Sequence, residues 1–256
     1  YQQFQCQYHG WIYSNEGKLK NARGFDKSEL KKSDFNLKEI NVSVWNGLMF
    51  INFDKRCNPL ESIYEKLEKR INKRNFSSYQ FYKRDSYNIA CNWKIYMDNY
   101  LEGLHIPIVH PELNKTINYK SYKTEIHDQF SLQWCSIDPQ LNPYKNDSSE
   151  DLIAYYVTIF PNVILNIAPG RLQTNIVEPI DEKNCSVHFD YYFEQIDEKQ
   201  IQKDLDFSDI IQREDIEICE SVQASYEAKG FKNGIISKRY ESGIMHFHSR
   251  LKEILL

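Results

Sequence analysis

Hydrophobic and polar residues follow two different patterns along the chain, with a change near residue 58. Up to about residue 56, short strand-like runs are separated by turns, and Asn46-Gly47 lies between two of these runs. An Asn-Gly pair in that position is typical of a two-residue β-hairpin turn. Residues 60–74 instead have apolar side chains at helical spacing, with charged residues between them. Because the stretch from Asp54 to Pro59 is polar and contains proline, we predict one domain over 1–58 and another over 59–256.

The second part of the chain combines strand-like runs with helical segments. Residues 79–90 have an extended pattern, and residues 92–104 are helical, with the helix ending near Pro107. The strand-like runs that follow lack proline, as expected for strands within one large antiparallel sheet; they are residues 130–137, 154–160, 163–167, 172–177 and 186–195. A long helix over 209–228 and a short one over 246–255 complete an α+β pattern.

Composition narrows the class of protein. The chain of 256 residues has 32 basic and 36 acidic side chains, and its net charge of −4 provides no electrostatic footprint for nucleic acid. No apolar run approaches the roughly 20 residues of a membrane span. We therefore expect neither nucleic acid nor a membrane as a partner. The six cysteines have no short regular spacing, so we predict reduced, mostly buried thiols in the cytoplasm, with Cys6 as the exception.

Cys6 and His9 form the first candidate site. They are separated by two residues on a turn that contains Gly10, so one loop offers a thiolate and an imidazole to the same metal. This pair of ligands suits zinc or an iron–sulfur cluster. Two ligands do not complete a four-ligand site, and an incidental Cys and His on a turn is the alternative interpretation.

A second candidate site lies between Asn92 and Leu113. Asn99, Glu102 and His105 are spaced by three and would share a stripe of one helix. Proline at 107 would break that helix, so His110 approaches from another direction, and the two imidazoles build an open metal site. Two histidines that are independently hydrogen-bonded are the alternative.

Asp215 is the third candidate. It lies four residues after Ile211 and three before Ile218, beside the apolar face of the predicted helix 209–228. A buried carboxylate needs a partner, either a metal ion or a basic side chain, whereas an exposed acid would need none. Two histidines and one carboxylate form the facial triad of non-haem Fe(II) oxygenases, and a Cys/His loop suggests a Rieske [2Fe–2S] centre that supplies electrons.

These segments resemble the catalytic α subunit of Rieske-type non-haem iron ring-hydroxylating oxygenases, over essentially the whole chain. The most specific part is Asn-Trp-Lys followed by Glu-x-x-His-x-x-x-x-His; the matching segments begin at Cys6, Trp45, Asn92, Glu214 and Glu241. The resemblance implies the C-terminal part of a Rieske domain over 1–58. It also implies a helix-grip (START-like) catalytic domain over 59–256, a curved antiparallel sheet around a long helix.

The resemblance also implies roles for individual residues and partners. Cys6 and His9 would be the second ligand pair of the Rieske cluster, and His105, His110 and Asp215 the ligands of a mononuclear Fe(II). Glu102 would link a neighbouring subunit's Rieske histidine to the iron-bound histidine, and Asn99 would lie close to the iron. Relatives assemble as rings, usually homotrimers, and receive electrons from NAD(P)H through a separate reductase, with or without a ferredoxin.

The sequence departs from the family pattern in two places. The first Cys-x-His pair of the Rieske motif is missing, and the sequence starts at Tyr1 and not at a methionine. We therefore expect an N-terminally truncated chain in which half of the cluster ligands are present. Leu104 also stands where relatives often have tyrosine before the first iron-binding histidine.

The substrate is inferred from finer resemblance. The segment around His105 looks most like the choline-monooxygenase-like branch, which implies O₂-dependent hydroxylation next to a quaternary ammonium. A cation–π cage would then use some of five aromatic residues; these are Tyr155, Tyr156, Phe160, Tyr191 and Phe193. Hydroxylation or demethylation of an aromatic acid, with Arg171 as anion partner, is an alternative. A non-catalytic ligand-binding or assembly subunit with an incomplete cluster is another.

Overall fold

The computed structural model describes residues 3–26, 28–71, 74–140, 152–229 and 234–256. The chain divides into two compact units, Tyr1–Leu67 and Glu68–Leu256, and the division falls within helix α1 (Glu61–Arg70). The domain boundary expected at residue 58 stays a prediction. No helix in the described part of the chain is long and apolar enough to cross a membrane.

The first unit contains two small antiparallel sheets. One is β1-β2-β3 (Gln3–Gln5, Ile12–Ser14, Leu19–Asn21), followed by a 3₁₀ turn, η1 (Lys32–Phe35); Leu19, Ala22 and Leu30 form its core. The other is the hairpin β4-β5 (Asn41–Trp45, Leu48–Asn52). Asn46 and Gly47 join its strands with φ values of 50° and 84°. Positive φ at both positions is what a type I′ turn requires, so the predicted Asn-Gly hairpin is confirmed.

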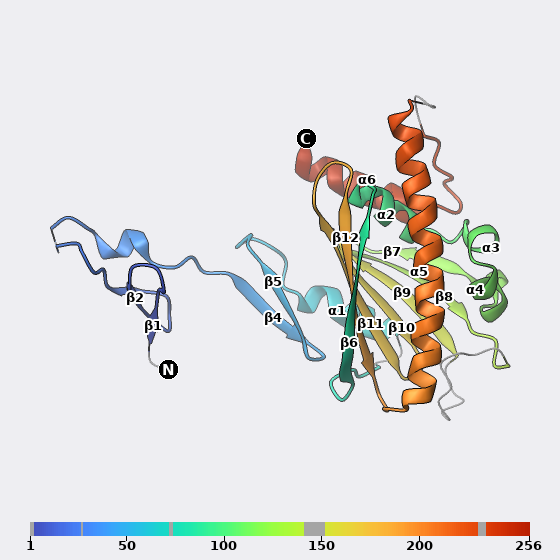
Figure 1. The fold of residues 1–256 in the computed structure, drawn as a ribbon, viewed down its shortest axis with the longest axis horizontal. Coiled ribbons are helices and arrows are strands. Elements are labelled where there is room, and N and C mark those ends of the chain that lie inside the picture. The colour runs from blue at the N-terminus through green and yellow to red at the C-terminus, as the bar shows by residue number, and fades with distance from the viewer. Residues whose placement is uncertain (1–2, 27, 72–73, 141–151, 230–233) are drawn as a thin grey trace. The chain divides into compact units, whose positions relative to one another are not determined.

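The second unit is built on one seven-stranded antiparallel sheet in the order β6-β12-β11-β10-β9-β8-β7 (Figure 1). The strands are β6 (Gln80–Ile89), β7 (Lys123–Ile126), β8 (Phe130–Ser136), β9 (Ile153–Ile159), β10 (Val163–Ala168), β11 (Arg171–Pro179) and β12 (Cys185–Phe193). From β7 to β12 each strand pairs with the next one in the chain, and β6 closes the order beside β12. All five predicted strand-like runs therefore lie in the sheet.

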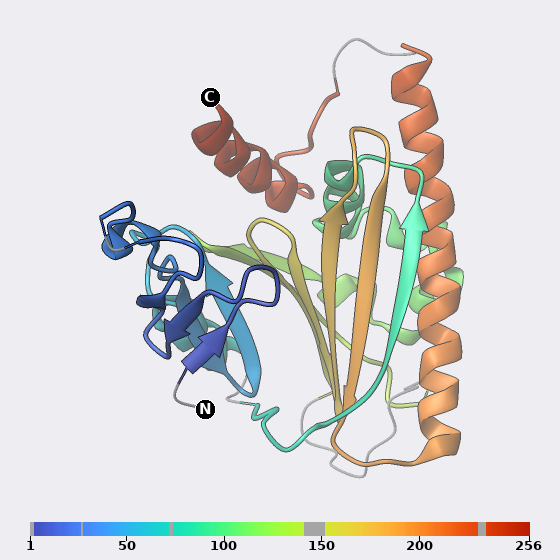
Figure 2. The same ribbon diagram turned by 60° about the vertical axis from the view of Figure 1, so that its left-hand side comes forward.

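Several helices pack against this sheet, and the 30-residue α5 (Glu198–Glu227) runs along one of its faces (Figure 2). The helix α2 (Trp93–Tyr100) packs against both α5 and β11. The short elements α3 (Ile106–Val109), α4 (Pro111–Thr116) and η2 (Tyr119–Ser121) follow α2, and α6 (Ser242–Leu255) ends the chain beside β7. Buried side chains of α2, α5, α6 and the β10–β12 strands form the main core.

Two predicted helices have different bounds in the structure. The long helix begins at Glu198, not near Asp209, because Asp197 caps it by accepting hydrogen bonds from the amides of Lys199 and Gln200 at 3.1 and 3.2 Å. The helix predicted over 92–104 ends at Tyr100. Pro107 does not break it but lies in the first turn of α3, a position where proline fits a helix.

Candidate metal centre and its cavity

One stripe of α5 carries polar side chains toward the sheet. Asp204, Ser208, Gln212 and Asp215 are spaced by four, four and three residues, so they lie on one face of the helix over about three turns. Asp204 and Gln212 are 3% and 2% exposed. Buried polar side chains are costly unless they have hydrogen-bonding or charged partners. A helix face this polar therefore indicates a site that supplies such partners.

The turn after α2 gives Glu102 and His105 their positions. Glu102 is nine-tenths buried, and its carboxylate accepts hydrogen bonds from the backbone amides of Leu104 and His105, which bend the chain away from the helix. Gly103 allows this bend to pack closely, since a Cβ there would lie 2.6 Å from the ring of Tyr122. Glu102 and His105 therefore share a turn, and the single helical stripe expected for Asn99, Glu102 and His105 is wrong.

The structure brings His105, His110 and Asp215 together. One ligand atom from each lies within 4.8 Å of the other two. The Nε2 atom of His110 is 3.0 Å from Oδ1 of Asp215, and Nε2 of His105 is 3.9 Å from the same oxygen. The two imidazole rings are nearly perpendicular, with centroids 5.1 Å apart. We call these three residues the triad.

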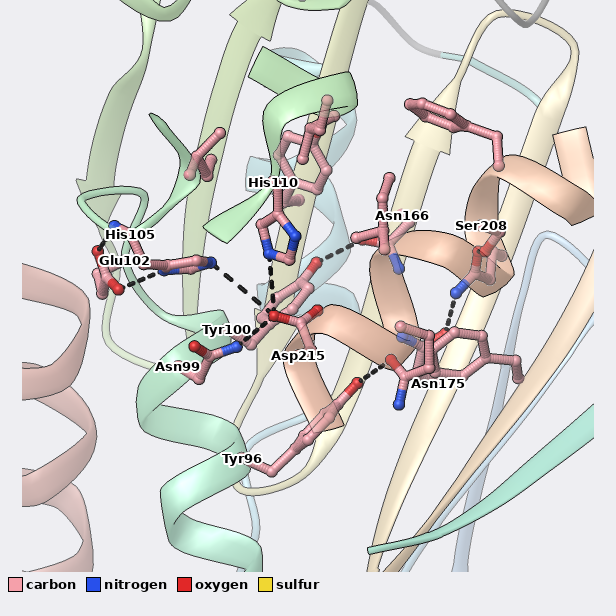
Figure 3. A pocket seen from close by; sticks show the side chains of 18 of the residues that line it. Tyr96, Asn99, Tyr100, Glu102, His105, His110, Asn166, Asn175, Ser208 and Asp215 are labelled. Atoms are coloured by element: carbon pink, nitrogen blue, oxygen red, sulfur yellow. Dashed lines mark hydrogen bonds and ion pairs between the residues drawn. The ribbon is translucent and has the colours of Figure 1, made fainter. Parts of the chain in front are cut away.

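Each triad histidine has its second ring nitrogen engaged by a carboxylate. His105 donates Nδ1–H to Glu102 (Figure 3). His110 donates Nδ1–H to Oε2 of Glu214 at 2.7 Å. Both Nε2 atoms are thereby directed at Asp215, the orientation that carboxylate–histidine pairs give to metal ligands. Burial lowers the pKa of His110, but the carboxylates of Asp215 and Glu214 outweigh this, and the pKa is raised.

Asn99 connects α2 to the triad. Its side-chain amide donates to Oδ1 of Asp215 at 2.6 Å. Figure 3 shows Asn99 on the side of Asp215 opposite Ser208. The donor set fits a metal ion of the 2-His-1-carboxylate type. Two imidazole nitrogens and one carboxylate oxygen converge, and neighbouring residues hold each of the three side chains.

The triad lies at one end of a cavity of about 120 Å³ between α2, α5 and the sheet. Six tyrosine and phenylalanine rings line the cavity: Tyr96, Tyr100, Tyr122, Tyr156, Phe189 and Phe207. Of the five aromatic residues that the sequence offered for a cage, Tyr156 lines the cavity; Tyr155, Phe160, Tyr191 and Phe193 do not and belong to packed parts of the sheet. Alternation along a strand separates neighbours such as Tyr155 and Tyr156 onto opposite faces.

A polar wall forms the other end of the cavity. Arg171, Gln173 and Asn175 alternate along β11, so all three face α5 and line the cavity. Nε of Arg171 is 3.1 Å from the carboxylate of Asp204, and its Nη2 donates to Gln173 and, at 3.4 Å, to Ser208. Figure 3 shows Ser208 and Asn175 on the opposite side of the pocket from His105 and His110.

Cys6 and His9 lie on one turn of the first unit. The amide of Cys6 donates to the carbonyl of Trp11 at 2.8 Å, and the amide of Gly10 donates to the carbonyl of Cys6 at 3.0 Å. Gly10 has φ +72°, which other residues adopt with strain. Cys6 is exposed, and both side chains border a shallow hollow. The structure thus places both side chains on the same turn, and their role as cluster ligands stays a prediction.

Glu214 is the site residue for which the sequence gave no role. The one sequence feature that points to a role for Glu214 is its place immediately before Asp215. Its contact with His110 joins residues 104 apart in the chain, and a pairing of that kind follows from tertiary structure. All six cysteines are free, and the four at positions 91, 135, 185 and 219 are buried, as predicted.

An antiparallel sheet crossed by one long helix, with two histidines and an aspartate converging in the cavity between them, defines an α+β domain suited to one metal ion. The chain belongs to the family of ring-hydroxylating α subunits, whose catalytic domain matches residues 76–256.

Relatives in this family include choline and carnitine monooxygenases. Chloroplastic choline monooxygenase of Arabidopsis thaliana is 32% identical over 269 residues, which cover 97% of this chain and 62% of the relative. The choline monooxygenase of Amaranthus tricolor is 28% identical over 263 residues, covering 98% and 59%. The oxygenase subunit of carnitine monooxygenase from Escherichia coli K12 is 27% identical over 263 residues, covering 97% and 70%. The chain thus spans about three fifths of the plant relatives.

Solved structures support the fold. The quaternary ammonium Rieske monooxygenase CntA, in complex with an inhibitor, aligns with a TM-score of 0.80 at 20% identity over 99% of this chain and 72% of that one. Naphthalene 1,2-dioxygenase from Rhodococcus sp. aligns with a TM-score of 0.70 at 19% identity, covering 100% and 76%. The α+β fold expected from the sequence is confirmed.

Proposed function

We propose that this chain is the oxygenase component of a Rieske-type monooxygenase that hydroxylates a quaternary ammonium compound. The observation that carries the proposal is the triad, in which each histidine is oriented by its own carboxylate. The choline and carnitine monooxygenases among its relatives support the substrate class.

His105, His110 and Asp215 would hold a mononuclear Fe(II) ion on one side and leave its other positions open. When bound, the iron would activate O₂; a hydroxylation of this type consumes one O₂, two electrons and two protons and yields the hydroxylated product and water. Glu102 and Glu214 keep both imidazoles in the tautomer whose Nε2 is available to a metal. Asn99 fixes the carboxylate of Asp215 by a hydrogen bond to Oδ1.

The cavity walls suit a bulky cation. Three carboxylates, Glu102, Glu214 and Asp215, outnumber the two charges of a divalent ion, so the triad end remains negative when a metal is bound. Tyr100, Tyr122 and the other rings offer aromatic faces, to which a quaternary ammonium is attracted.

Electrons would reach the iron from an NAD(P)H-dependent reductase, with or without a ferredoxin, through a Rieske [2Fe–2S] centre. Cys6 and His9 would supply half of its ligands, and Glu102 would link a neighbouring subunit's cluster to His105 within a homotrimer. Free cysteines in the described chain support a reducing compartment such as the cytoplasm. The chloroplastic relatives make a plastid the competing location.

An aromatic acid is the second candidate substrate, and the observation that favours it is Arg171 in the cavity wall. Titration with choline and with benzoate separates the two classes. Heat of binding with choline alone supports the ammonium class, and with benzoate alone the aromatic acid.

Fe(II) titration of the metal-free protein under argon tests the metal site. We expect one Fe(II) per chain, and a loss of affinity of about 100-fold or more for Asp215→Asn, because the amide oxygen replaces the only charged ligand. Glu217→Gln, which changes an exposed acid two residues away on α5, serves as the matched control and should bind as the wild type does. Equal affinities for all three proteins would refute the proposed iron site.

A further inference from the structure

Arg171 has a setting that the metal site does not explain. Its side chain is about 6% exposed and lies in the cavity wall, at the end away from the triad. Among the described residues that line the cavity, it is the only lysine or arginine. A buried guanidinium is costly unless it is paired, so its place in a ligand cavity calls for a reason.

The partners of Arg171 hold the guanidinium in one orientation. Asp204 lies 3.1 Å from Nε and does not line the cavity, so it supports Arg171 from behind. Gln173 and Ser208, which do line the cavity, are hydrogen-bonded to Nη2. The ring of Tyr191 lies 5.4 Å from the guanidinium carbon, and the hydroxyl oxygen of Tyr191 is 3.1 Å from Oγ of Ser208. The Nη2 edge therefore lies on the cavity side of the group.

The carboxyl of Asp204 takes up a proton more readily than that of an ordinary aspartate. Burial raises the pKa of its carboxyl to about 6, although Arg171 acts to lower it. A second carboxylate placed against Arg171 would favour protonation of Asp204 further, so the site can exchange one anion for another without a net buried charge.

The two ends of the cavity are separated by a fixed length. Ser208 and Asp215 are seven residues apart on the same unbroken helix, which is about 10 Å along its axis. A ligand that places an ammonium group near the acidic triad end and an anion at Arg171 needs a short methylene spacer between its two charges.

We propose that Arg171 binds a carboxylate of the substrate, so that the cavity selects a betaine-type zwitterion over a quaternary ammonium alcohol. The inference rests on the proposed function, of which it specifies the substrate class. Arg171 is the specificity-determining residue, with Gln173 and Ser208 as neutral hydrogen-bonding neighbours. A carboxylate oxygen would accept from Nη2 in place of Ser208, whose oxygen is 3.4 Å away.

Calorimetric titration under argon with two ligands tests this inference. The ligands are γ-butyrobetaine and the corresponding alcohol, 4-(trimethylammonio)butan-1-ol, which differ at the end that would meet Arg171. We expect the wild type to bind the carboxylate 10- to 100-fold more tightly, the range for a charge-assisted hydrogen bond. The double variant Arg171→Gln/Asp204→Asn removes both charges and keeps hydrogen-bonding groups; the ratio of its affinities for the two ligands should fall to about one.

Two further variants sharpen the test. Arg171→Lys keeps the charge without the planar fork and should retain part of the preference, which a merely structural role would not predict. Arg84→Gln/Asp190→Asn removes a more exposed Arg–Asp pair between β6 and β12, with N–O distances of 2.6 Å, outside the cavity lining; it should leave the preference intact.

The outcomes separate the two proposals. Equal binding of both ligands by the wild type, or an unchanged preference in the double variant, overturns the role of Arg171 and leaves the ammonium class standing. If neither ligand binds, both the role of Arg171 and the quaternary ammonium class are refuted. The iron site is judged separately by the Fe(II) titration of Asp215→Asn.

Discussion

The two triad histidines are oriented by carboxylates that come from different parts of the chain. Glu102 is three residues before His105, so their contact forms within one turn. Glu214 reaches His110 from α5, a separation of 104 residues. His110 is 2% exposed at its side chain and Glu214 27%, so this pair is partly shielded from solvent. The position of His110 therefore depends on the packing of α5 as well as on its own loop.

Glu214→Gln should lower the affinity for Fe(II) about 10- to 100-fold, the usual effect of removing a carboxylate that orients a metal-binding histidine. The amide retains the size of the side chain but removes the charge that holds Nδ1–H of His110. Fe(II) titration under argon measures the change, with Glu217→Gln as the control. An affinity equal to that of the wild type would show that Glu214 has no part in orienting the ligand.

Asp204 should make the stability of the protein depend on pH. Burial raises the pKa of its carboxyl from an ordinary 3.8 to about 6, so folding favours the protonated form. Its contribution is fully present below about pH 4 and is lost as the pH rises through about 6. As the pH rises over this range, the free energy of unfolding of the wild type should therefore fall by about 3 kcal/mol relative to that of Asp204→Asn.

Urea denaturation of both proteins between about pH 4 and pH 8 measures that difference. Asp206→Asn, an exposed change on the same helix, should give a difference that is flat with pH. A flat difference for Asp204→Asn as well would contradict the raised pKa.

The end of α2 is fixed by close packing against α6. Leu101, the C-cap of α2, is 2% exposed, and Gly243 of α6 lies directly against its carbonyl oxygen, so a Cβ at position 243 would overlap that atom. The overlap involves backbone, which cannot move as a flexible side chain can. The contact of these two helices therefore helps to set where the turn with Glu102 and His105 begins.

Gly243→Ala should destabilise the protein by about 1–3 kcal/mol, because α6 must shift away from Leu101 to admit the methyl group. Gly234→Ala is the control, since a Cβ at that position meets nothing within 4 Å; its effect should be within about 0.5 kcal/mol. Denaturant unfolding gives both values. If the two variants were equally stable, the packing of α6 on α2 would not be tight.

The accuracy of the sequence prediction differs between elements for physical reasons. The hairpin at Asn46-Gly47 and the five sheet strands depend on local backbone preference and alternation, which a sequence displays directly. The first three turns of α5 and the end of α2 were missed because the cap at Asp197 and the carboxylate of Glu102 determine them. Arg171 is predicted from the sequence as an anion partner, which stays a prediction, and its place opposite the triad follows only from the fold.

At the scale of the whole molecule, the residues expected to bind iron belong to both compact units. Cys6 and His9 lie in the first unit, and the triad lies in the second. The proposed homotrimer would allow the cluster of one chain to supply electrons to the metal of another. Glu102, which we propose lies on the electron path, is nine-tenths buried beside His105.

Light scattering during size-exclusion chromatography tests the assembly. Three copies of the 30.6 kDa chain should give a particle of about 92 kDa, as expected for closed cyclic symmetry. A mass near that of one chain, at micromolar concentration, would contradict the trimer.

Because α5 is one continuous helix, it also limits which insertions and deletions the site can tolerate. Asp204, Ser208 and Asp215 share one stripe of the helix, so one inserted residue between them would rotate everything beyond it by about 100° and advance it by about 1.5 Å. Such a change would move Asp215 away from His105 and His110, whereas a substitution on the outer face would leave both ends in place. The eleven-residue spacing from Asp204 to Asp215 is therefore expected to keep its length among related sequences, whereas residues on the outer face of the helix between them can vary.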